Sequence, residues 1–323
     1  MSPERSAVPP PVTAVLDASS RWLPTRLGEV EDRLREAISP WQGSPLGEDA
    51  GATLAAGGKR LRPMLVLLCG GEAGGAAAVR AATAIELVHM ATLVHDDVLD
   101  QAPLRRGQPT VAATSGRLRA QATGDLLLSR AFALLAEAGD ARAVELLADA
   151  SVALARGELA QRQDAFDLGI TEERYLQRCR LKTATLFECA CLLGFDDGRL
   201  RRFGAEVGLA FQLLDDVLDV TGPPERTGKA RGTDLLDGTV TLPLILAAGH
   251  DPGIRGLELQ GLDAAAAEAL CERIAATGAL EEVRSRALAM VAAGKRALDD
   301  GGLEAEQRQL LELVADGVVQ RYS

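Results

Sequence analysis

The pattern Asp-Asp-x-x-Asp occurs twice in the chain, at residues 96–100 and at residues 215–219. Each copy ends a largely apolar run, residues 87–94 in the first case and 208–214 in the second. In a helix, residues four apart share a face with Cβ atoms about 5–6 Å apart, so the first and last Asp of each copy point the same way. Clustered carboxylates repel each other unless a cation lies between them.

Mg²⁺ takes oxygen ligands and completes its coordination with water or substrate phosphates. Two acidic clusters therefore predict a site that holds a polyphosphate through several Mg²⁺ ions. A single copy could equally be a solvated helix end, but two copies behind matching apolar runs favour a function. The pairs Asp196-Asp197 and Asp299-Asp300 lack the third Asp and stand beside glycine, so we interpret them as solvated helix caps.

Positive charge comes mainly from arginine, and lysine occurs only at positions 59, 182, 229 and 295. A lysine ammonium is a point charge that suits a phosphate oxygen, although a solvated surface lysine is the ordinary alternative for each. Lys59 lies in a glycine-led turn before a helix expected to begin near Pro63, where free N–H groups favour an anion. Arg105 and Arg106 follow the first cluster, and each can contact a phosphate bidentately. These cations suffice for two diphosphates, one held through metal ions and one held directly.

The elements that carry these residues are expected to be helices. No proline falls between Pro109 and Pro223, and none follows Pro252, so both stretches can form long helices. Ala, Leu, Glu and Arg are abundant, and runs of β-branched residues are scarce. We expect one all-α domain over residues 15–323, preceded by a disordered segment at residues 1–14.

Composition narrows the function classes. A formal charge of −11 argues against a nucleic-acid partner, which demands a basic face. No stretch looks apolar for the length of a membrane span, and the N-terminus lacks the apolar core of a signal peptide. We therefore expect a cytoplasmic protein without stable membrane insertion. The five cysteines lack metal-type spacing and are expected to be reduced and buried, and a lone histidine such as His89 or His95 is usually structural.

Together these segments resemble the trans-isoprenyl diphosphate synthases of the polyprenyl synthetase family, most of all its long-chain members. The resemblance covers about residues 50–245 in the family's order and spacing; its blocks are Gly57-Gly58-Lys59-Arg60-Leu61-Arg62-Pro63, Glu86 through His89 to Arg105-Arg106-Gly107, Gly124-Asp125, Gly157-Glu158 with Gln161, Lys182-Thr183, Phe211 through Asp219, and Gly228-Lys229 through Asp234 to Thr241-Leu242-Pro243. It implies an all-α, single-domain bundle around a deep central cavity, the type I isoprenoid synthase fold, usually as a homodimer.

The resemblance also implies the reaction, a head-to-tail 1'-4 condensation of isopentenyl diphosphate onto an allylic diphosphate. Mg²⁺ would be the cofactor, with about three ions per substrate-loaded site and Mn²⁺ as the alternative ion. The metal ions would neutralise the charge on the departing diphosphate, and the apolar helices would keep water from the allylic cation.

Carried over position by position, the resemblance implies a role for the polar residues of these blocks. The metal ligands are Asp96, Asp100, Asp215 and Asp219, and the catalytic set is Asp96, Asp97, Asp100, Lys182, Asp215 and Asp216. The allylic diphosphate contacts are Arg105, Lys182, Thr183, Gln212 and Lys229. The isopentenyl diphosphate contacts are Lys59, Arg62, His89 and Arg106, so His89 gains a function that its isolated appearance does not support.

One position departs from the family's pattern. Many members have a further lysine in a Gly-Lys-x-Thr-Leu-Pro block, where this chain has Thr239. The substitution removes one cation from the expected allylic set, and we expect activity to persist with looser binding of the allylic diphosphate. Restoring a lysine at this position should therefore lower the Michaelis constant for the allylic substrate.

Product length in this family is limited by bulk on the helix before the first cluster. One helical turn rises about 5.4 Å, close to one isoprene unit, so each turn with a small residue admits roughly one more unit. Ala91 and Thr92 stand where short-chain members tend to carry an aromatic residue, and Phe132 is a candidate floor deeper down that could equally serve core packing alone. We favour an all-trans product of about C30–C50 over geranylgeranyl or farnesyl diphosphate.

Two other functions compete with this interpretation. A terpene cyclase folds its cations against aromatic faces, and this chain has only 3% aromatic residues and a second full Asp-Asp-x-x-Asp. A non-catalytic partner subunit of a heteromeric synthase would be expected to have lost metal ligands, and none is missing here. Both alternatives are therefore less favoured than a synthase.

Overall fold

The computed structural model describes residues 10–19, 22–105, 107–222, 231–299 and 302–320. Within these ranges the chain is almost entirely helical, and two short strands form one antiparallel hairpin. The elements are α1 (Pro10–Ala18), α2 (Trp22–Ile38), η1 (Ser39–Trp41), α3 (Pro45–Ala55), α4 (Leu61–Gly70), η2 (Glu72–Gly74), α5 (Gly75–Leu99), β1 (Leu104–Arg105), β2 (Gln108–Pro109), α6 (Val111–Ser115), α7 (Arg117–Glu137), α8 (Ala141–Gln163), α9 (Glu172–Cys179), η3 (Arg180–Ala184), α10 (Thr185–Gly194), α11 (Gly198–Thr221), α13 (Thr233–Leu236), α14 (Leu242–His250), α15 (Pro252–Arg255), α16 (Ala264–Ala276), α17 (Ala279–Ala297) and α18 (Ala305–Gln320).

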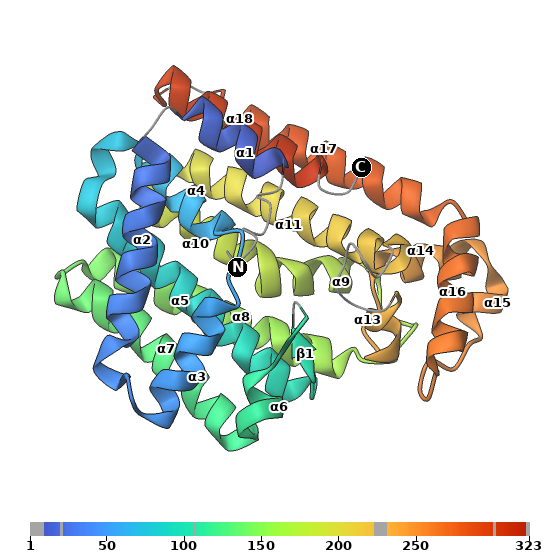
Figure 1. Ribbon diagram of the computed structural model, residues 1–323. Coiled ribbons are helices and arrows are strands. Elements are labelled where there is room, and N and C mark those ends of the chain that lie inside the picture. The colour runs from blue at the N-terminus through green and yellow to red at the C-terminus, as the bar shows by residue number, and fades with distance from the viewer. Residues whose placement is uncertain (1–9, 20–21, 106, 223–230, 300–301, 321–323) are drawn as a thin grey trace, which may run out of the picture.

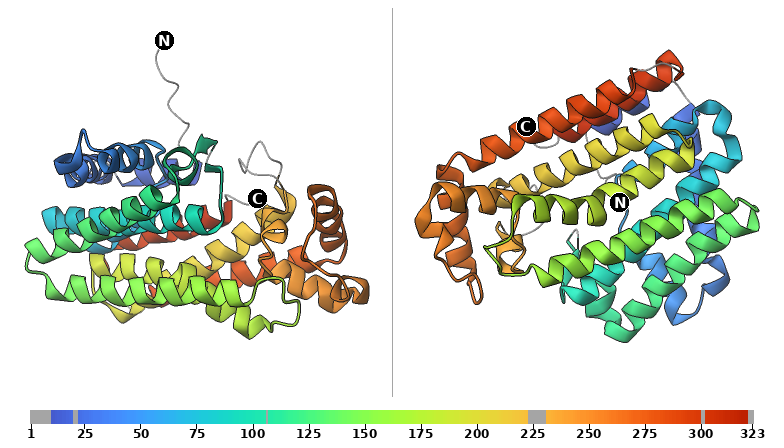
Figure 2. Two further views of the ribbon diagram at one scale, coloured as in Figure 1. Left: turned by 90° about the horizontal axis from the view of Figure 1, so that it is seen from below. Right: turned by 180° about the vertical axis from the view of Figure 1, so that it is seen from behind.

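The two helices that end in acidic clusters, α5 and α11, run through the middle of the bundle (Figure 1). α5 packs along α7 and also contacts α2, α4 and α10, while α11 packs along α10 and α17. Seen from below, α2 and α3 form a layer on one side of α5 and α7, and α8, α10 and α11 lie on the other side (Figure 2). The all-α fold expected from the sequence is confirmed.

Several helices begin at a capping side chain that the sequence provides. The Asp140 carboxylate accepts the Ala143 N–H at 2.9 Å at the start of α8. The Thr171 hydroxyl accepts from Arg174 at the start of α9, and Asp197 accepts from Arg199 at the start of α11. These bonds satisfy N–H groups that a helix leaves without an internal acceptor. The interpretation of Asp197 as a cap is confirmed, whereas Asp300 lies outside the described residues.

The N-terminal boundary differs from the expectation. Residues 10–14, placed in the disordered segment by composition, belong to α1, and residues 1–9 lie outside the described part of the chain. α1 packs against α18, and Val15 is buried, so contacts with the far end of the chain stabilise a helix that local composition does not predict.

One segment corrects the expectation about membrane spans. Residues Glu72–Leu99 are long and apolar enough to cross a membrane by length and composition. However, 72% of the apolar window is buried inside the protein, as in the core helix of a bundle, and the segment ends in Asp96 and Asp97. The apolar character of this helix is therefore explained by packing. All five cysteines are free and buried, as predicted.

Candidate active site

The first acidic cluster lies at the C-terminal end of α5. Asp96 is half-buried, Asp97 is buried, and Asp100 is exposed just beyond the last helical residue. The Asp100 N–H donates to the Asp96 carbonyl oxygen at 2.8 Å, so the helical turn is complete and the four-residue spacing keeps both side chains on one face. Burial raises the pKa of Asp96 to about 6, against the lowering effect of Lys182 and with further increases from Glu158 and Asp100.

Asp97 points to a different side of the helix and is held by the hairpin that follows. The Arg105 Nε atom in β1 lies 2.7 Å from the Asp97 Oδ1 atom, and only 7% of the Asp97 side chain is exposed. Arg105 is thereby fixed beside the first cluster, where the sequence predicted a diphosphate contact. Arg106 lies outside the described residues.

The second cluster lies at the C-terminal end of α11, and its middle Asp is again the buried one. Asp215 is exposed, Asp216 is buried, and Asp219 is half-buried. The Asp219 carboxylate accepts the N–H of Asp234 at 3.2 Å, and its carbonyl oxygen accepts the N–H of Gly232 at 2.9 Å. These bonds join the end of α11 to the start of α13.

Asp216 is the centre of a buried hydrogen-bond network. The Tyr175 hydroxyl donates to Asp216 Oδ2 at 2.5 Å, and the Gln212 amide donates to Oδ1 at 2.7 Å. The Thr183 hydroxyl donates to the side-chain oxygen Oε1 of Gln212 at 2.6 Å. Burial raises the pKa of Asp216, and the charges of Asp234 and Asp215 add to this effect, while the donated hydrogen bonds oppose it.

The segment between the clusters is η3, which has the wider turn of a π-helix. Such turns occur mostly as single bulges within α-helices and are frequent at functional sites. η3 packs against α8 and α11, so Lys182 reaches a partner on α8 while Thr183 reaches Gln212 on α11. One short segment thus connects the surroundings of both acidic clusters.

A chain of ion pairs continues from η3 to the first cluster. Lys182 pairs with Glu158 on α8, Glu158 also pairs with Arg162 at 2.8 Å, and Arg162 contacts Asp100. Burial alone would raise the pKa of Glu158, but the charges of Lys182 and Arg162 lower it below its usual range. Two cations and two carboxylates therefore alternate from η3 to the end of α5.

Two glycines explain how the helices come this close. A Cβ atom on Gly157 would lie 2.6 Å from the Lys182 backbone nitrogen, and one on Gly124 would lie 2.3 Å from the His95 Nε2 atom. At Gly157 the close atoms are backbone, so only a residue without a side chain allows α8 to reach η3 there; at Gly124 an added Cβ would displace the His95 ring. Asp125, the residue after Gly124, then pairs with His95 at 3.2 Å.

A cavity of about 540 Å³ opens between α3, α5 and the hairpin. His89, Asp97 and Arg105 line it, which brings predicted residues of both diphosphate sites together. Arg62 lies with its guanidinium carbon 4.9 Å from the centre of the Phe187 ring, and Lys59 is exposed. Neither Lys59 nor Arg62 lines the cavity. Arg60 also lines it and is held by Glu31 and, at 2.7 Å, by Glu86.

The acidic clusters fit a metal that is shared with a substrate. Among the described residues, no three His, Cys, Asp or Glu side chains converge closely enough to hold an ion by themselves. Mg²⁺ is characteristically bound by one or two carboxylates together with water and substrate phosphates. The exposed Asp100 and Asp215 and the half-buried Asp96 and Asp219 offer such oxygens at two helix ends.

The remaining predicted residues are placed as follows. Lys229 lies outside the described residues. Ala91 is buried, the Thr92 hydroxyl donates to the His89 carbonyl oxygen at 2.8 Å, and Phe132 packs against the core. None of these three lines the cavity beside the hairpin, and their role in product length stays a prediction.

Three residues at the centre of the site were not assigned from the sequence. Glu158, Arg162 and Tyr175 hold Lys182, Asp100 and Asp216 respectively. Glu158 and Arg162 are four residues apart on α8, a spacing that indicates an ion pair on one helix face. Nothing local marks Tyr175, because its partner Asp216 is 41 residues away along the chain.

Comparison with known proteins agrees with this site. Residues 45–270 match the polyprenyl synthetase family. Component 2 of heptaprenyl diphosphate synthase from Geobacillus stearothermophilus is 41% identical over 285 residues, which cover 84% of this chain and 88% of that protein.

Two solved structures have the same fold over nearly their whole length. A decaprenyl diphosphate synthase from Rhodobacter capsulatus has a TM-score of 0.86 at 32% identity, covering 97% of this chain and 99% of that one. A polyprenyl synthase from Caulobacter crescentus, solved with calcium and isoprenyl diphosphate, also has a TM-score of 0.86, at 33% identity, covering 95% and 98%.

The helical bundle and its paired acidic clusters define an enzyme of the prenyltransferase class. The chain belongs to the polyprenyl synthetase family, whose match extends over more than half of its length and includes both clusters.

Proposed function

We propose that the chain catalyses the Mg²⁺-dependent head-to-tail condensation of isopentenyl diphosphate onto an allylic diphosphate, giving an all-trans polyprenyl diphosphate. The observation that carries this proposal is the connection of the two acidic clusters through η3. Lys182 stands among the charges of the first cluster and Thr183 belongs to the network of Asp216. A diphosphate bridged by metal ions between two helix ends would meet fixed polar groups from this segment.

The residues of the site would have three separate roles in the reaction. Mg²⁺, held by Asp96 and Asp100 on one side and by Asp215 and Asp219 on the other, would offset the negative charge on the departing diphosphate. Lys182 and Arg105 add positive charge in fixed positions, which stabilises a leaving group as it becomes more negative. The buried helix faces behind the clusters exclude water that would otherwise capture an allylic cation.

The isopentenyl diphosphate would bind without metal ions. His89 on α5 lines the cavity, and Lys59 and Arg62 come from the turn before α4 and from its first turn. Phosphate oxygens suit both the lysine ammonium and the bidentate guanidinium. This site would present the double bond of the acceptor to the carbon that loses the allylic diphosphate.

A product of about C30–C50 follows from the small residues on α5, at roughly one isoprene unit per helical turn. In this proposal the small side chains of Ala91 and Thr92 would leave room for the product at the turn above the first cluster, and Phe132 would be its floor. The names of two relatives, a heptaprenyl and a decaprenyl diphosphate synthase, support a long product rather than geranylgeranyl or farnesyl diphosphate.

The proposal is tested with the purified chain, Mg²⁺, isopentenyl diphosphate and a series of allylic primers that includes farnesyl diphosphate. We expect release of diphosphate, loss of this release when the metal is chelated, and products whose carbon number is read by mass spectrometry. Replacing Asp96 or Asp215 by asparagine should abolish turnover while leaving the helical content unchanged. Turnover that persists in chelator would contradict the metal-dependent mechanism.

The assembly state is a second point of the proposal. We infer a cytoplasmic homodimer that acts without a second protein, and light scattering of the purified chain measures its mass directly. The relative named component 2 of a heptaprenyl diphosphate synthase makes a heteromeric enzyme the specific alternative. A chain that binds both substrates but releases no diphosphate alone would favour that alternative.

A further inference from the structure

We propose that Arg162 is an additional diphosphate-binding residue of this site, which exchanges its contact with Asp100 for the substrate diphosphate when Mg²⁺ binds Asp100. The inference rests on the proposed function and extends it to a residue outside the polar positions that the family resemblance assigns. It starts from the position of Arg162 on the last turn of α8, between a predicted metal ligand and the partner of Lys182.

The guanidinium of Arg162 joins two carboxylates of different kinds. Its Nε atom lies 2.8 Å from Glu158, whose side chain is 17% exposed, and its Nη2 atom contacts Asp100, whose side chain is 29% exposed. A guanidinium has five N–H donors in a fixed fork, so it can keep Glu158 and contact another anion with other donors. Glu158 would therefore keep its ion pair with Arg162 while the other partner of Arg162 changes.

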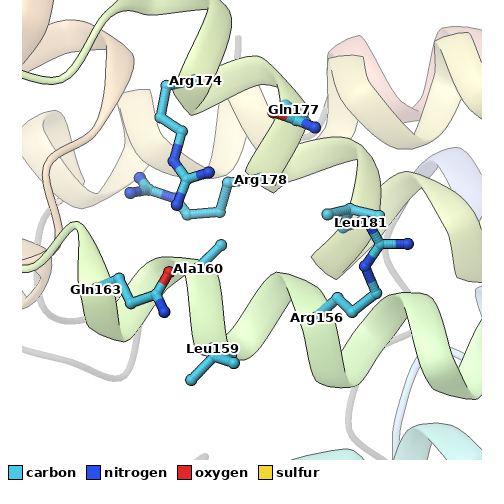
Figure 3. Close-up of a pocket in the computed structure, with 8 residues that line it drawn as sticks. All are labelled: Arg156, Leu159, Ala160, Gln163, Arg174, Gln177, Arg178 and Leu181. Carbon is cyan, nitrogen blue, oxygen red and sulfur yellow. The ribbon is translucent and has the colours of Figure 1, made fainter.

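The backbone that carries Arg162 is held from the opposite side of α8. Asp164, two residues further on, is buried and pairs with Arg174 at 3.1 Å and with Arg178 at 3.4 Å. These two arginine side chains lie close together beside α8, at a hollow of about 190 Å³ (Figure 3). Because the helix end is fixed there, an exchange of partners at Arg162 involves its side chain alone.

The contact with Asp100 is the weaker of the two because both groups are partly exposed. The side chains of Arg162 and Asp100 are 38% and 29% exposed, and such pairs contribute little net stability. Mg²⁺ prefers carboxylate oxygens and would compete for the oxygen that Arg162 contacts. A diphosphate that shares this Mg²⁺ then lies next to the displaced guanidinium.

The neighbouring loop cannot provide a cation at this position. The chain has no lysine or arginine between Arg231 and Arg255. The Phe166 N–H donates to the Gly238 carbonyl oxygen at 2.8 Å, which places the neutral loop of Gly238 and Thr239 beside the turn that follows α8, four residues after Arg162. Arg162 is thus a positive charge at the end of the site where Thr239 offers none.

The test compares Arg162→Gln with Arg162→Lys and with a matched control, Arg142→Gln. Arg142 lies on the same helix and also joins two carboxylates, Glu145 at 2.7 Å and Asp196 at 2.8 Å, at the end opposite Arg162. Thermal unfolding of each variant shows whether it folds. Two binding measurements need no turnover: the Mg²⁺ concentration for half-maximal thermal stabilisation, and the affinity for inorganic diphosphate at saturating Mg²⁺, measured by calorimetry.

For Arg162→Gln we expect opposite changes in the two measurements. The half-maximal Mg²⁺ concentration should fall about two- to fivefold, because a competitor for Asp100 is gone. The dissociation constant for diphosphate should rise about tenfold or more, because a charge-assisted hydrogen bond is lost. Arg162→Lys should recover part of the diphosphate affinity, and Arg142→Gln should match the unmodified protein in both.

The alternative is that the ion pair between Arg162 and Asp100 only holds α8 against the end of α5, and this alternative predicts a different result. Loss of this ion pair would leave both measurements unchanged or weaken both together, and either outcome would overturn the role of Arg162. If the unmodified protein itself does not bind inorganic diphosphate in the presence of Mg²⁺, the proposed function is wrong and not merely this extension of it.

Discussion

Replacing Gly157 by alanine tests how closely α8 must approach η3. The added Cβ atom would lie 2.6 Å from the Lys182 nitrogen and 2.9 Å from both the Lys182 Cα and the Leu181 carbonyl carbon. All three neighbours are backbone atoms, so no side-chain rotation relieves the contact. α8 and η3 would have to separate by a large fraction of an ångström.

The expected cost follows from two opposing effects. Overpacking of this kind costs about 1–3 kcal/mol, whereas alanine in place of glycine within a helix contributes about 1 kcal/mol. We therefore expect a net loss of up to about 2 kcal/mol, equivalent to a fall in melting temperature of up to about 6 °C. Activity should fall further, by about 100-fold, because Lys182 moves relative to Glu158 and to the first cluster.

Thermal unfolding and steady-state kinetics of the condensation reaction measure the two effects separately. Gly28→Ala is the matched control, since Gly28 lies within α2 and an added Cβ atom there meets nothing within 4 Å. That variant should be equal to or slightly more stable than the unmodified protein, with unchanged kinetics. If Gly157→Ala behaved like Gly28→Ala, the close contact between α8 and η3 would not be needed for Lys182 to function.

Three further predictions concern the acidic clusters and the product. Tyr175→Phe removes a hydrogen-bond donor from Asp216, whose pKa is raised to about 8. The substitution should destabilise the protein by about 1.5–3 kcal/mol at pH 9, where Asp216 is ionised, because a hydrogen bond to a charged group is lost. The destabilisation should be smaller at pH 6, where Asp216 is protonated. Because burial raises the folded-state pKa of Asp96 to about 6, the contribution of this group to stability is present below pH about 4 and is lost as the pH rises through about 6. In the presence of a chelator, the free energy of unfolding should therefore fall by about 1–2 kcal/mol between pH 5 and pH 7.5 because of this group. The thermal stabilisation by Mg²⁺ should be larger at pH 7.5 than at pH 5, because a ligand must be deprotonated to bind the ion. Equal stabilisation at both pH values would exclude Asp96 as a ligand. Ala91→Tyr should shorten the main product towards about C15–C20 in mass spectra, and an unchanged product profile would show that the tunnel does not pass this turn.

Much of the fold could be predicted because its determinants are local. Proline-free, alanine- and leucine-rich stretches indicated long helices, and Asp197 is a cap whose partner is two residues away. The grouping of Asp96 with Asp100 and of Asp215 with Asp219 needed only the helical repeat. The error at α1 has the opposite cause, because this helix is stabilised by contacts with α18, about 300 residues further along the chain, which local sequence does not reveal.

The interior of the site depends on contacts that local patterns do not encode. Arg162 reaches Asp100 across 62 residues, and Lys182 reaches Glu158 across 24. Gly157 and Gly124 were visible as parts of family blocks, but only the structure shows which backbone or ring each one admits. The family resemblance assigned the polar positions that are proposed to bind substrate. It did not assign Glu158, Arg162 and Tyr175, which contact those positions from elsewhere in the chain.

The middle Asp of each motif shows why identical sequences do not make identical clusters. Successive helical residues point about 100° apart, so when the first and last Asp face the substrate the middle one turns into the bundle and needs its own partner. Asp97 receives a cation, Arg105, while Asp216 receives two neutral donors, Tyr175 and Gln212. Burial and the charges of Asp234 and Asp215 outweigh these two donors, so the pKa of Asp216 stays raised. The second cluster therefore carries less negative charge at neutral pH than its sequence suggests, and a diphosphate bridged between the clusters, as proposed, would meet unequal electrostatic fields at its two ends.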